Sequence, residues 1–282
     1  MSISIVTNVQ SLKVQANLTS ATNKLNSAIE RMTTGYKINS AKDNAAGYSI
    51  AQSMDTKLSS YDVAANNAQI GLDMLTTTEE NYSLIQEHLQ RVRDLTEQAA
   101  NGTYSDDSRA AIEAEINSRL EEINRVAGSA EYNGMILMDG TMGAVNIQVG
   151  IDGTAGSRVE LAASLFAKAD AKTLLGNTEP ADFAAAAAAK DTASAKLATI
   201  DSAIENISNR ITTLGASQNR LESAIDSIQV TTENLTSSLS TVRDADIATE
   251  STRYLQAQIL QSAATTLLST ANQTPSIALQ LI

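Results

Sequence analysis

One repeat of apolar residues constrains this chain more than any other feature of its sequence. It extends from Leu197 to Val242 in alternating steps of three and four residues, and only Gln218 and Thr232 place polar side chains in it. This spacing is typical of a coiled-coil seam. At about 1.5 Å per residue, the seam predicts a helix roughly 70 Å long, which needs partner helices to cover it. Its apolar members are Leu197, Ile200, Ile204, Ile207, Ile211, Leu214, Leu221, Ile225, Ile228, Leu235, Leu239 and Val242.

Shorter repeats predict the partner helices. We expect a first helix that ends near Thr34, a second over about Ala45–Ala100, and a third that begins at Ser105 and ends at Gly128. The seam of the second helix slips by one residue after Leu75, which would change the local winding of a supercoil. The expected stripes of the first and third helices are Val14, Leu18, Ala21, Leu25, Ala28 and Met32, and Ile112, Ile116, Leu120, Ile123 and Ala127.

A short stretch in the middle of the chain changes from helical to strand periodicity. Apolar and polar residues alternate from Val145 to Val149, which predicts a half-buried strand, and Arg158–Leu161 is a candidate partner. We interpret residues 165–180 as a loop and the alanine run Ala184–Ala189 as a lead-in to the long helix rather than core. The predicted fold class is therefore mainly α, a long antiparallel coiled-coil bundle with a small β-hairpin excursion.

Both ends of the chain carry apolar repeats with little charge. From Tyr254 to Ile282 there is no Asp, Glu, Lys or Arg, and residues 1–12 carry no ionisable side chain. An uncharged amphipathic helix seldom faces water in a soluble monomer. We therefore expect the two terminal helices to pair with each other and then with other copies, and to be disordered in the monomer. The C-terminal repeat is Ala257, Leu260, Ala264, Leu267 and Ala271.

The composition disfavours several classes of protein. The 20 Lys and Arg residues against 32 Asp and Glu residues give a net charge of −12, with no basic cluster, so we expect no nucleic-acid partner. No apolar run of about 18 residues occurs, so we expect no membrane-spanning helix. Cysteine is absent, which leaves no disulfide or thiolate chemistry. No cleavable signal peptide is visible at the N-terminus.

The sequence also lacks the patterns of a catalytic, metal or cofactor site. His88 is the only histidine, whereas metal sites need several ligands at set spacings. The adjacent carboxylates Glu79-Glu80 and Glu121-Glu122 diverge around a helix instead of converging on a substrate. We therefore expect no catalytic residue, no metal ion and no cofactor.

Several short motifs carry a family resemblance. They are Ile5-Val-Thr-Asn-Val9, Arg31-Met-Thr-Thr-Gly35, Asp43-Asn-Ala-Ala-Gly47, Leu89-Gln-Arg-Val-Arg-Asp-Leu95, Glu131-Tyr-Asn-Gly134 and Ala271-Asn-Gln-Thr-Pro275, followed by Leu279, Leu281 and Ile282. In order and spacing they resemble bacterial flagellin. The resemblance implies that the N- and C-terminal helices pair in an inner coiled-coil domain, and that the other long helices and the hairpin form a rod domain around it.

The resemblance also implies a domain division. Residues 1–43 and 246–282 would form the inner coiled-coil domain. Residues 44–180, with a β-hairpin region at about 133–162, and residues 181–245 with the C-terminal long helix would form the rod domain. The family usually carries outer variable domains after the hairpin, and here only about Phe166–Lys190 occupies that place. We therefore expect a short form that lacks the outer domains.

The implied function is that of a structural subunit, which polymerises into the bacterial flagellar filament for motility. Its partners would be other copies of itself, the hook-junction and cap proteins and an export chaperone. Family members leave the cell without a cleaved signal peptide, so the expected location is the extracellular flagellum. We assign the strongest assembly role to Leu18, Leu25, Leu260, Leu267 and Leu268.

Four residues match positions through which many flagellins are recognised by the innate immune receptor TLR5. They are Gln90, Arg91, Leu95 and Glu115. The same residues can serve as subunit contacts along the rod, and the two roles are compatible. Mutating Arg91 and Glu115 and measuring receptor binding distinguishes them.

Two other classes of protein remain as alternatives. One is a secreted coiled-coil translocator or another type III-exported helical protein, which the uncharged C-terminus favours but its many Gln and Ser residues disfavour. The other is a cytoplasmic signalling coiled coil, which would carry charged residues through both ends. Filament formation by the purified chain discriminates the leading hypothesis from both.

Overall fold

The computed structural model describes residues 7–279 of the 282-residue chain, with side chains up to Gln273. Ile5, Leu281 and Ile282 and the side chain of Leu279, which contribute to the family resemblance, lie outside this description. The helices are α1 (Val9–Thr34), α2 (Ala45–Ala100), α3 (Asp106–Ser129), α4 (Ala171–Leu174), α5 (Pro180–Ala188), α6 (Ala193–Arg243) and α7 (Ile247–Leu279). The strands are β1 (Glu131–Tyr132), β2 (Met135–Ile136), β3 (Val145–Gln148) and β4 (Arg158–Leu161), with 3-10 turns η1 (Ala155–Ser157) and η2 (Ala163–Phe166). The predicted fold class is confirmed.

The chain divides into two compact units. The terminal unit comprises residues 1–58 and 233–282, and the middle unit comprises residues 59–232. The terminal unit contains α1, α7, the first turns of α2 and the last turns of α6. The middle unit contains the remainder of α2 and α6, the helices α3 to α5 and all four strands.

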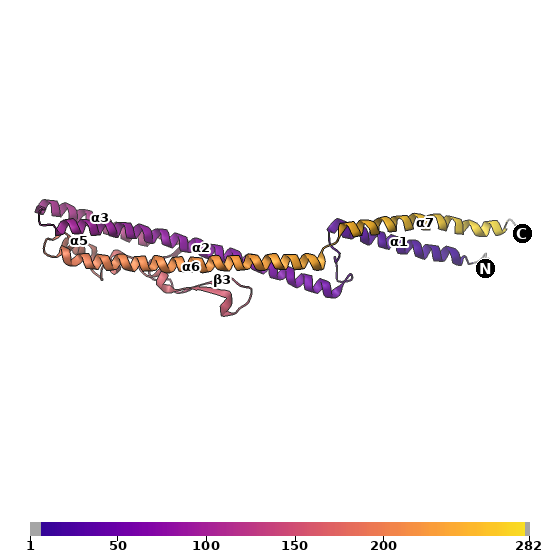
Figure 1. Cartoon of the computed structure of the whole chain (residues 1–282), viewed down its shortest axis with the longest axis horizontal. Coiled ribbons are helices and arrows are strands. Elements are labelled where there is room, and N and C mark those ends of the chain that lie inside the picture. Colours follow the sequence, from indigo (N-terminus) through magenta and orange to yellow (C-terminus); the bar gives the residue numbers. More distant parts are fainter. Residues whose placement is uncertain (1–6, 280–282) are drawn as a thin grey trace. The chain divides into compact units, whose positions relative to one another are not determined.

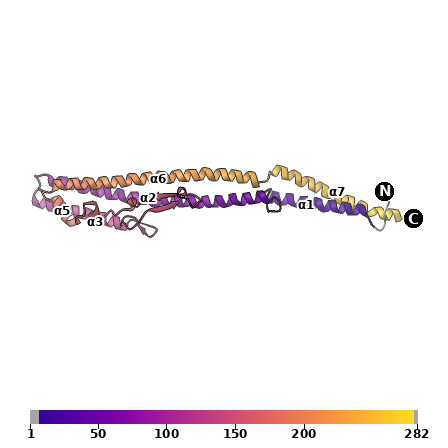
Figure 2. The ribbon, with the colours of Figure 1, turned by 90° about the horizontal axis from the view of Figure 1, so that it is seen from below.

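In the terminal unit, α1 and α7 lie side by side and antiparallel (Figures 1 and 2). The side-chain amide of Asn8 donates to the carbonyl of Ala271 at 2.7 Å, near the start of α1. In the middle of α1, Gln261 donates to Thr22 at 3.2 Å. Gly35 ends α1 in a left-handed conformation (φ 75°), which glycine adopts without strain. The predicted pairing of the terminal helices is confirmed.

In the middle unit, the long seam of α6 packs against α2 as its periodicity predicts. Every seventh residue from Ile200 to Ile228 is buried. The polar interruption at Gln218 has a partner, because its side-chain amide donates to a carboxylate oxygen of Glu79 on α2 at 2.7 Å. A polar residue with one specific partner in a coiled-coil seam favours a single register.

The buried face of α2 corrects the predicted position of the phase change. Buried residues keep one alternation of four and three residues from Ala64 to Ala99, so the seam does not slip after Leu75. Gly71 lies in this continuous face. A Cβ at Gly71 would come within 3.1 Å of Ile147 on β3 and 3.3 Å of Leu221 on α6. A search for apolar side chains does not include glycine. The missing side chain of Gly71 nevertheless lets a strand and a helix approach α2 closely.

The predicted strand pair is present, and a second pair was missed. β3 and β4 are antiparallel, with Val145 opposite Leu161. β1 and β2 form a shorter hairpin, in which Asn133 and Gly134 have positive φ values of 48° and 79°. An Asn-Gly pair at positive φ is a strong hairpin-turn signal.

The predictions for residues 165–180 and for the alanine run were wrong. The first segment contains part of η2 and all of α4. The alanine run lies in α5, which packs against α3 (Figure 1). Phe183 is fully buried on α5 together with three of the alanines. Small alanine side chains let two helices approach closely, so a run without a leucine seam can still be core. The buried alanines of α5 are Ala184, Ala187 and Ala188, and Ala193 at the start of α6 is also buried.

A buried tyrosine holds the segment before α4 against α2 and α6. The Tyr82 hydroxyl donates to the carbonyl of Leu165 at 3.0 Å. The Arg210 guanidinium donates to the carbonyl of Ala167 at 2.9 Å and lies 5.7 Å from the Tyr82 ring centroid. Burial raises the pKa of Tyr82, and the nearby charge of Arg210 opposes this rise.

Candidate functional site

The large apolar residues of α7 lie mainly outside the stripe that contacts α1. The buried positions are small, Ala257 and Ala264. Leu255, Ile259 and Leu267 are 54%, 69% and 58% exposed. A helix of a soluble monomer normally shows the reverse pattern, with its large apolar residues inside. We call Leu255, Ile259, Leu260 and Leu267 the outer apolar face of α7.

The five residues assigned an assembly role occupy two different environments. Leu18 and Leu25 on α1 and Leu268 on α7 are half-buried. Leu260 and Leu267 are exposed, at 45% and 58%. The first three therefore belong to the contact zone of the α1–α7 pair, whereas the last two are available to another molecule.

A groove of about 750 Å³ runs beside the α1–α7 pair. Its walls are α1 from Ala16 to Arg31 and α7 from Glu250 to Leu260. Small and polar side chains of α1 line most of it, and Leu260 of the outer apolar face closes one side. The groove can therefore accept side chains of another helix, with charged residues (Lys24, Arg31, Glu250 and Arg253) on both of its walls.

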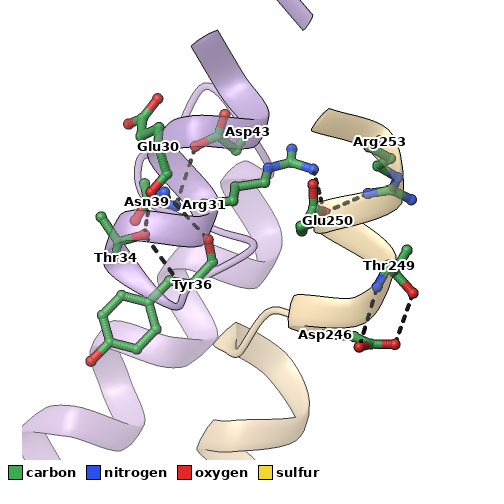
Figure 3. A network of polar contacts seen from close by, with 10 residues as sticks. All are labelled: Glu30, Arg31, Thr34, Tyr36, Asn39, Asp43, Asp246, Thr249, Glu250 and Arg253. Carbon is green, nitrogen blue, oxygen red and sulfur yellow. Dashed lines mark hydrogen bonds and ion pairs between the residues drawn. The ribbon is translucent and has the colours of Figure 1, made fainter. Parts of the chain in front are cut away.

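A buried carboxylate connects α1 and α7 at one end of this groove (Figure 3). The side chain of Glu250 is 5% exposed and pairs with Arg31 on α1 at 3.4 Å and with Arg253 one turn further along α7 at 2.6 Å. A buried carboxylate needs such partners to offset its lost hydration. The sequence did not predict the Arg31–Glu250 pair, because the two residues come together only when α1 and α7 pack in the folded chain.

Backbone hydrogen bonds join the segment after α1 to the segment between α6 and α7. The backbone amide of Lys37 donates to the carbonyl of Arg243, and that of Ala245 donates to the carbonyl of Gly35, both at 2.8 Å. The Arg243 guanidinium lies 3.9 Å from the ring centroid of Tyr36 and pairs with Asp55 on α2 at 2.8 Å. The end of α1 and the end of α6 are thus held in one place.

Asp246 is the N-terminal cap of α7. Its carboxylate accepts a hydrogen bond from the hydroxyl of Thr249 at 2.8 Å (Figure 3). It also accepts one from the backbone amide of Ala248 at 2.9 Å. The bonds from Thr249, followed by that from Ala248, hold the pKa of Asp246 below its ordinary value of 3.8.

This cap predicts a pH dependence of the terminal unit. Because the folded-state pKa of Asp246 is lowered, its stabilising contribution is complete above pH 3.8 and is lost as the pH falls through the folded-state pKa. We expect the melting temperature of the wild-type chain to exceed that of Asp246→Asn at neutral pH, and the difference to vanish in acid. Thermal unfolding followed by circular dichroism measures it.

A second variant isolates the cause. Thr249→Val removes the hydroxyl donor and should raise the pKa of Asp246 toward 3.8, which NMR titration of the carboxyl carbon detects. A melting-temperature difference between wild type and Asp246→Asn that persists unchanged in acid would contradict the assignment.

Comparison with known proteins identifies the family. Residues 5–142 match the model of the bacterial flagellin N-terminal helical region, and residues 197–282 match that of the C-terminal helical region. Flagellin of Listeria monocytogenes is 34% identical over 98% of both chains. The chain belongs to the bacterial flagellin family. Only residues 143–196 separate the two matched regions, so it is a short flagellin.

Other relatives of this flagellin differ in length. B-type flagellin of Pseudomonas aeruginosa is 40% identical over 53% of this chain, and the match spans 31% of that protein. A putative flagellar hook-associated protein from Vibrio parahaemolyticus has the same fold over 72% of this chain, with a TM-score of 0.60 at 15% identity. Flagellins are structural proteins of the extracellular bacterial flagellum, not enzymes.

The four candidate receptor residues of this flagellin lie on α2 and α3. The Arg91 guanidinium donates to Glu115 on α3 through Nε at 2.9 Å and Nη2 at 2.8 Å. Gln90 is exposed beside this pair. Leu95 is 2% exposed and therefore packs in the core instead of lining the surface.

Two further features of this flagellin concern metal and membrane binding. His88 is half-buried on α2, and within residues 7–279 no group of three His, Cys, Asp or Glu side chains is placed to hold a metal ion. None of the described helices combines the length and apolarity needed to cross a membrane.

Sequence reasoning found two of the four residues of the outer apolar face. Leu260 and Leu267 belong to the predicted repeat, but Leu255 and Ile259 do not. The repeat was interpreted as one stripe, whereas α7 carries an alanine-rich stripe toward α1 and exposed leucine and isoleucine residues outside that stripe. A spacing of four between Leu255 and Ile259 was the available signal.

Proposed function

We propose that this chain polymerises through its terminal unit into the bacterial flagellar filament and serves motility as a mechanical subunit. The observation that carries the proposal is the outer apolar face of α7, Leu255, Ile259, Leu260 and Leu267, which is at least 45% exposed at each residue. Exposed apolar residues in contiguous rows are typical of protein interfaces.

The energetics favour association. Burial of one leucine or isoleucine side chain stabilises a contact by roughly 1.5–3 kcal/mol. Val9 and Leu12 on α1 are also more than half exposed and add to the apolar area of the terminal unit. Acidic and basic residues nearly balance in this unit, so the net charge of −12 lies on the middle unit. Electrostatic repulsion between copies is therefore weakest where the apolar faces meet.

The groove beside the α1–α7 pair supports a contact between unlike surfaces. In such a contact the outer apolar face of one copy enters the groove of the next. Repetition of a heterologous contact gives an open helical assembly when the rotation does not close a ring. Leu18, Leu25 and Leu268 then keep α1 and α7 together, and Leu260 and Leu267 make contacts between copies.

Filament formation by the purified chain tests this function. Light scattering should show large particles, and electron microscopy should show long filaments. Chains that lack residues 1–34 or residues 247–282 should form none, because each lacks one helix of the α1–α7 pair. Circular dichroism checks that the remaining helices are folded. Filaments formed by either trimmed chain would overturn the proposed role of the terminal unit.

The domain division and the remaining partners are part of the same proposal. We propose an inner coiled-coil domain of residues 1–43 and 246–282 and a rod domain of residues 44–245. The filament would contact hook-junction and cap proteins at its ends, and an export chaperone would bind the chain before it leaves the cell without a cleaved signal peptide. A co-purification with each candidate partner tests these contacts one by one.

We also propose that the α2–α3 surface around Arg91 and Glu115 is recognised by the receptor TLR5. The pair fixes a guanidinium and a carboxylate side by side, each about 40% exposed, next to the exposed amide of Gln90. Such a rigid polar group suits recognition by hydrogen bonds. Leu95 contributes by supporting α2 from within the core.

The receptor proposal has a matched control on the same helix. Arg91→Ala is expected to weaken binding of purified monomer to the receptor ectodomain by about tenfold, as loss of a charged hydrogen bond of about 1.5 kcal/mol would. Arg93→Ala removes an arginine that pairs instead with Asp201 on α6 and should change binding little. Equal affinities of wild type and Arg91→Ala in a surface plasmon resonance measurement would overturn it.

A further inference from the structure

The turn between α2 and α3 contains one of the two Asn-Gly steps of the chain, Asn101-Gly102. The other is Asn133-Gly134 in the β1–β2 hairpin. In such a step the backbone nitrogen of the glycine can attack the side-chain carbonyl carbon of the asparagine, because no glycine side chain blocks the approach. The groups around the two turns differ in whether they help or hinder this reaction.

The turn at Asn101 is arranged for attack. The backbone amide of Thr103 donates to Oδ1 of Asn101 at 3.2 Å, which draws the side-chain carbonyl over the backbone of Gly102. Among the described residues, no hydrogen-bond acceptor is assigned to the backbone amide of Gly102, whereas those of Asn101 and Tyr104 donate to carbonyls within the turn. Asn101 and Gly102 are both exposed, so water reaches the site.

Two features of this turn would stabilise the reacting state. Negative charge develops on Oδ1 as the tetrahedral intermediate forms, and the Thr103 amide already donates to that atom. The Cε atom of Lys190 lies 3.9 Å from the place that a Cβ on Gly102 would occupy, so the Lys190 side chain reaches this turn. A nearby cation favours the same developing charge.

The hairpin turn at Asn133 restrains the same reaction. Asn133 and Gly134 are both held at positive φ, and the paired residues Tyr132 and Met135 flank them directly. Rotation of the Asn133 backbone toward an attack geometry would break this pair. The chain therefore contains an internal control, the same Asn-Gly dipeptide in a rigid turn.

We propose that Asn101 is a site of spontaneous deamidation, positioned by the Thr103 amide and assisted by Lys190. A bond forms between the Gly102 nitrogen and Cγ of Asn101, the bond from Cγ to the side-chain nitrogen breaks, and ammonia leaves with the proton of the Gly102 amide. Water then opens the cyclic imide at either carbonyl and yields aspartate or isoaspartate at residue 101.

The product adds a negative charge at the C-terminal end of α2. That end carries the negative pole of the helix, so the new carboxylate is unfavourable there. Arg109 donates to the carbonyls of Ala99 and Tyr104 on either side of the turn. The modification thus places a slow chemical change at the junction of two core helices.

Peptide mapping by mass spectrometry of the full-length chain, incubated at neutral and mildly alkaline pH, tests the proposal. In the folded chain Asn101 is expected to convert severalfold faster than Asn133, and in urea the two rates should become equal. An Asn133 rate equal to or above that of Asn101 in the folded chain would overturn it.

Two variants separate the contributions at this site. Gly102→Ala should slow conversion at Asn101 severalfold and leave Asn133 unchanged. It meets no atom closer than 3.9 Å, so the fold tolerates it. Lys190→Gln should slow Asn101 alone. An Asn101 rate that neither variant alters would contradict the proposed chemistry, and an unchanged rate in Lys190→Gln alone would overturn the part assigned to the ammonium group.

Discussion

Replacement of Ile259 and Leu267 by serine in the full-length chain is expected to abolish filament formation while the helical content stays unchanged. Both side chains lie outside the stripe that contacts α1 and are 69% and 58% exposed, so serine leaves no cavity within the single chain. Each loss of a buried aliphatic side chain at a contact costs roughly 1.5–3 kcal/mol. Two such losses at every contact weaken association by a factor of about 10² or more.

The matched control for this variant keeps the two positions apolar. A chain with Ile259→Val and Leu267→Met has nearly the same apolar volume at the outer face of α7, and it should form filaments. Light scattering gives the extent of assembly, and electron microscopy gives filament length. Wild-type filaments from the double-serine chain would show that assembly uses other surfaces.

Replacement of Phe183 by alanine is expected to lower the free energy of unfolding by about 3–5 kcal/mol. Phe183 is fully buried on α5, and the ammonium of Lys196 lies 5.2 Å from its ring centroid. A cavity at this site cannot close easily, since α5 already contacts α3 through alanine side chains that have no alternative rotamers. Urea unfolding followed by circular dichroism measures the change.

Ala185→Ser is the control on the same helix. Ala185 is exposed, so its substitution should change the free energy of unfolding by less than about 0.5 kcal/mol. If Phe183→Ala proves as mild as Ala185→Ser, α5 is not part of the stabilising core of the middle unit.

Local chemistry made the long helices predictable. The seam of α6 repeats at a spacing that only a coiled-coil helix satisfies, and the structure buries every seventh residue of it from Ile200 to Ile228. Gly35 and Ser105 mark helix ends because a left-handed cap and a side-chain acceptor act within one turn of the chain. Such signals depend on neighbours in sequence and can be read without the fold.

Interactions between distant segments decided the remaining features. Gly71 belongs to the buried face of α2 because Ile147 and Leu221 approach it from β3 and α6. The alanine run became core because α3 lies close enough to cover it. These partners are distant in sequence. Periodicity alone therefore did not place Gly71 in the buried face of α2, and it assigned the alanine run to a lead-in instead of to the core.

The same distinction applies to the candidate assembly site. The sequence by itself determined that both ends of this flagellin are amphipathic, poor in charge and suited to pair, since these properties follow from composition and spacing. Only the tertiary structure decided which side of α7 meets α1. Alanines fit the close helix contact, so the larger Ile259 and Leu267 are left outside. Which of two apolar stripes is buried depends on the partner helix, and that information lies more than 200 residues away in the chain, on α1.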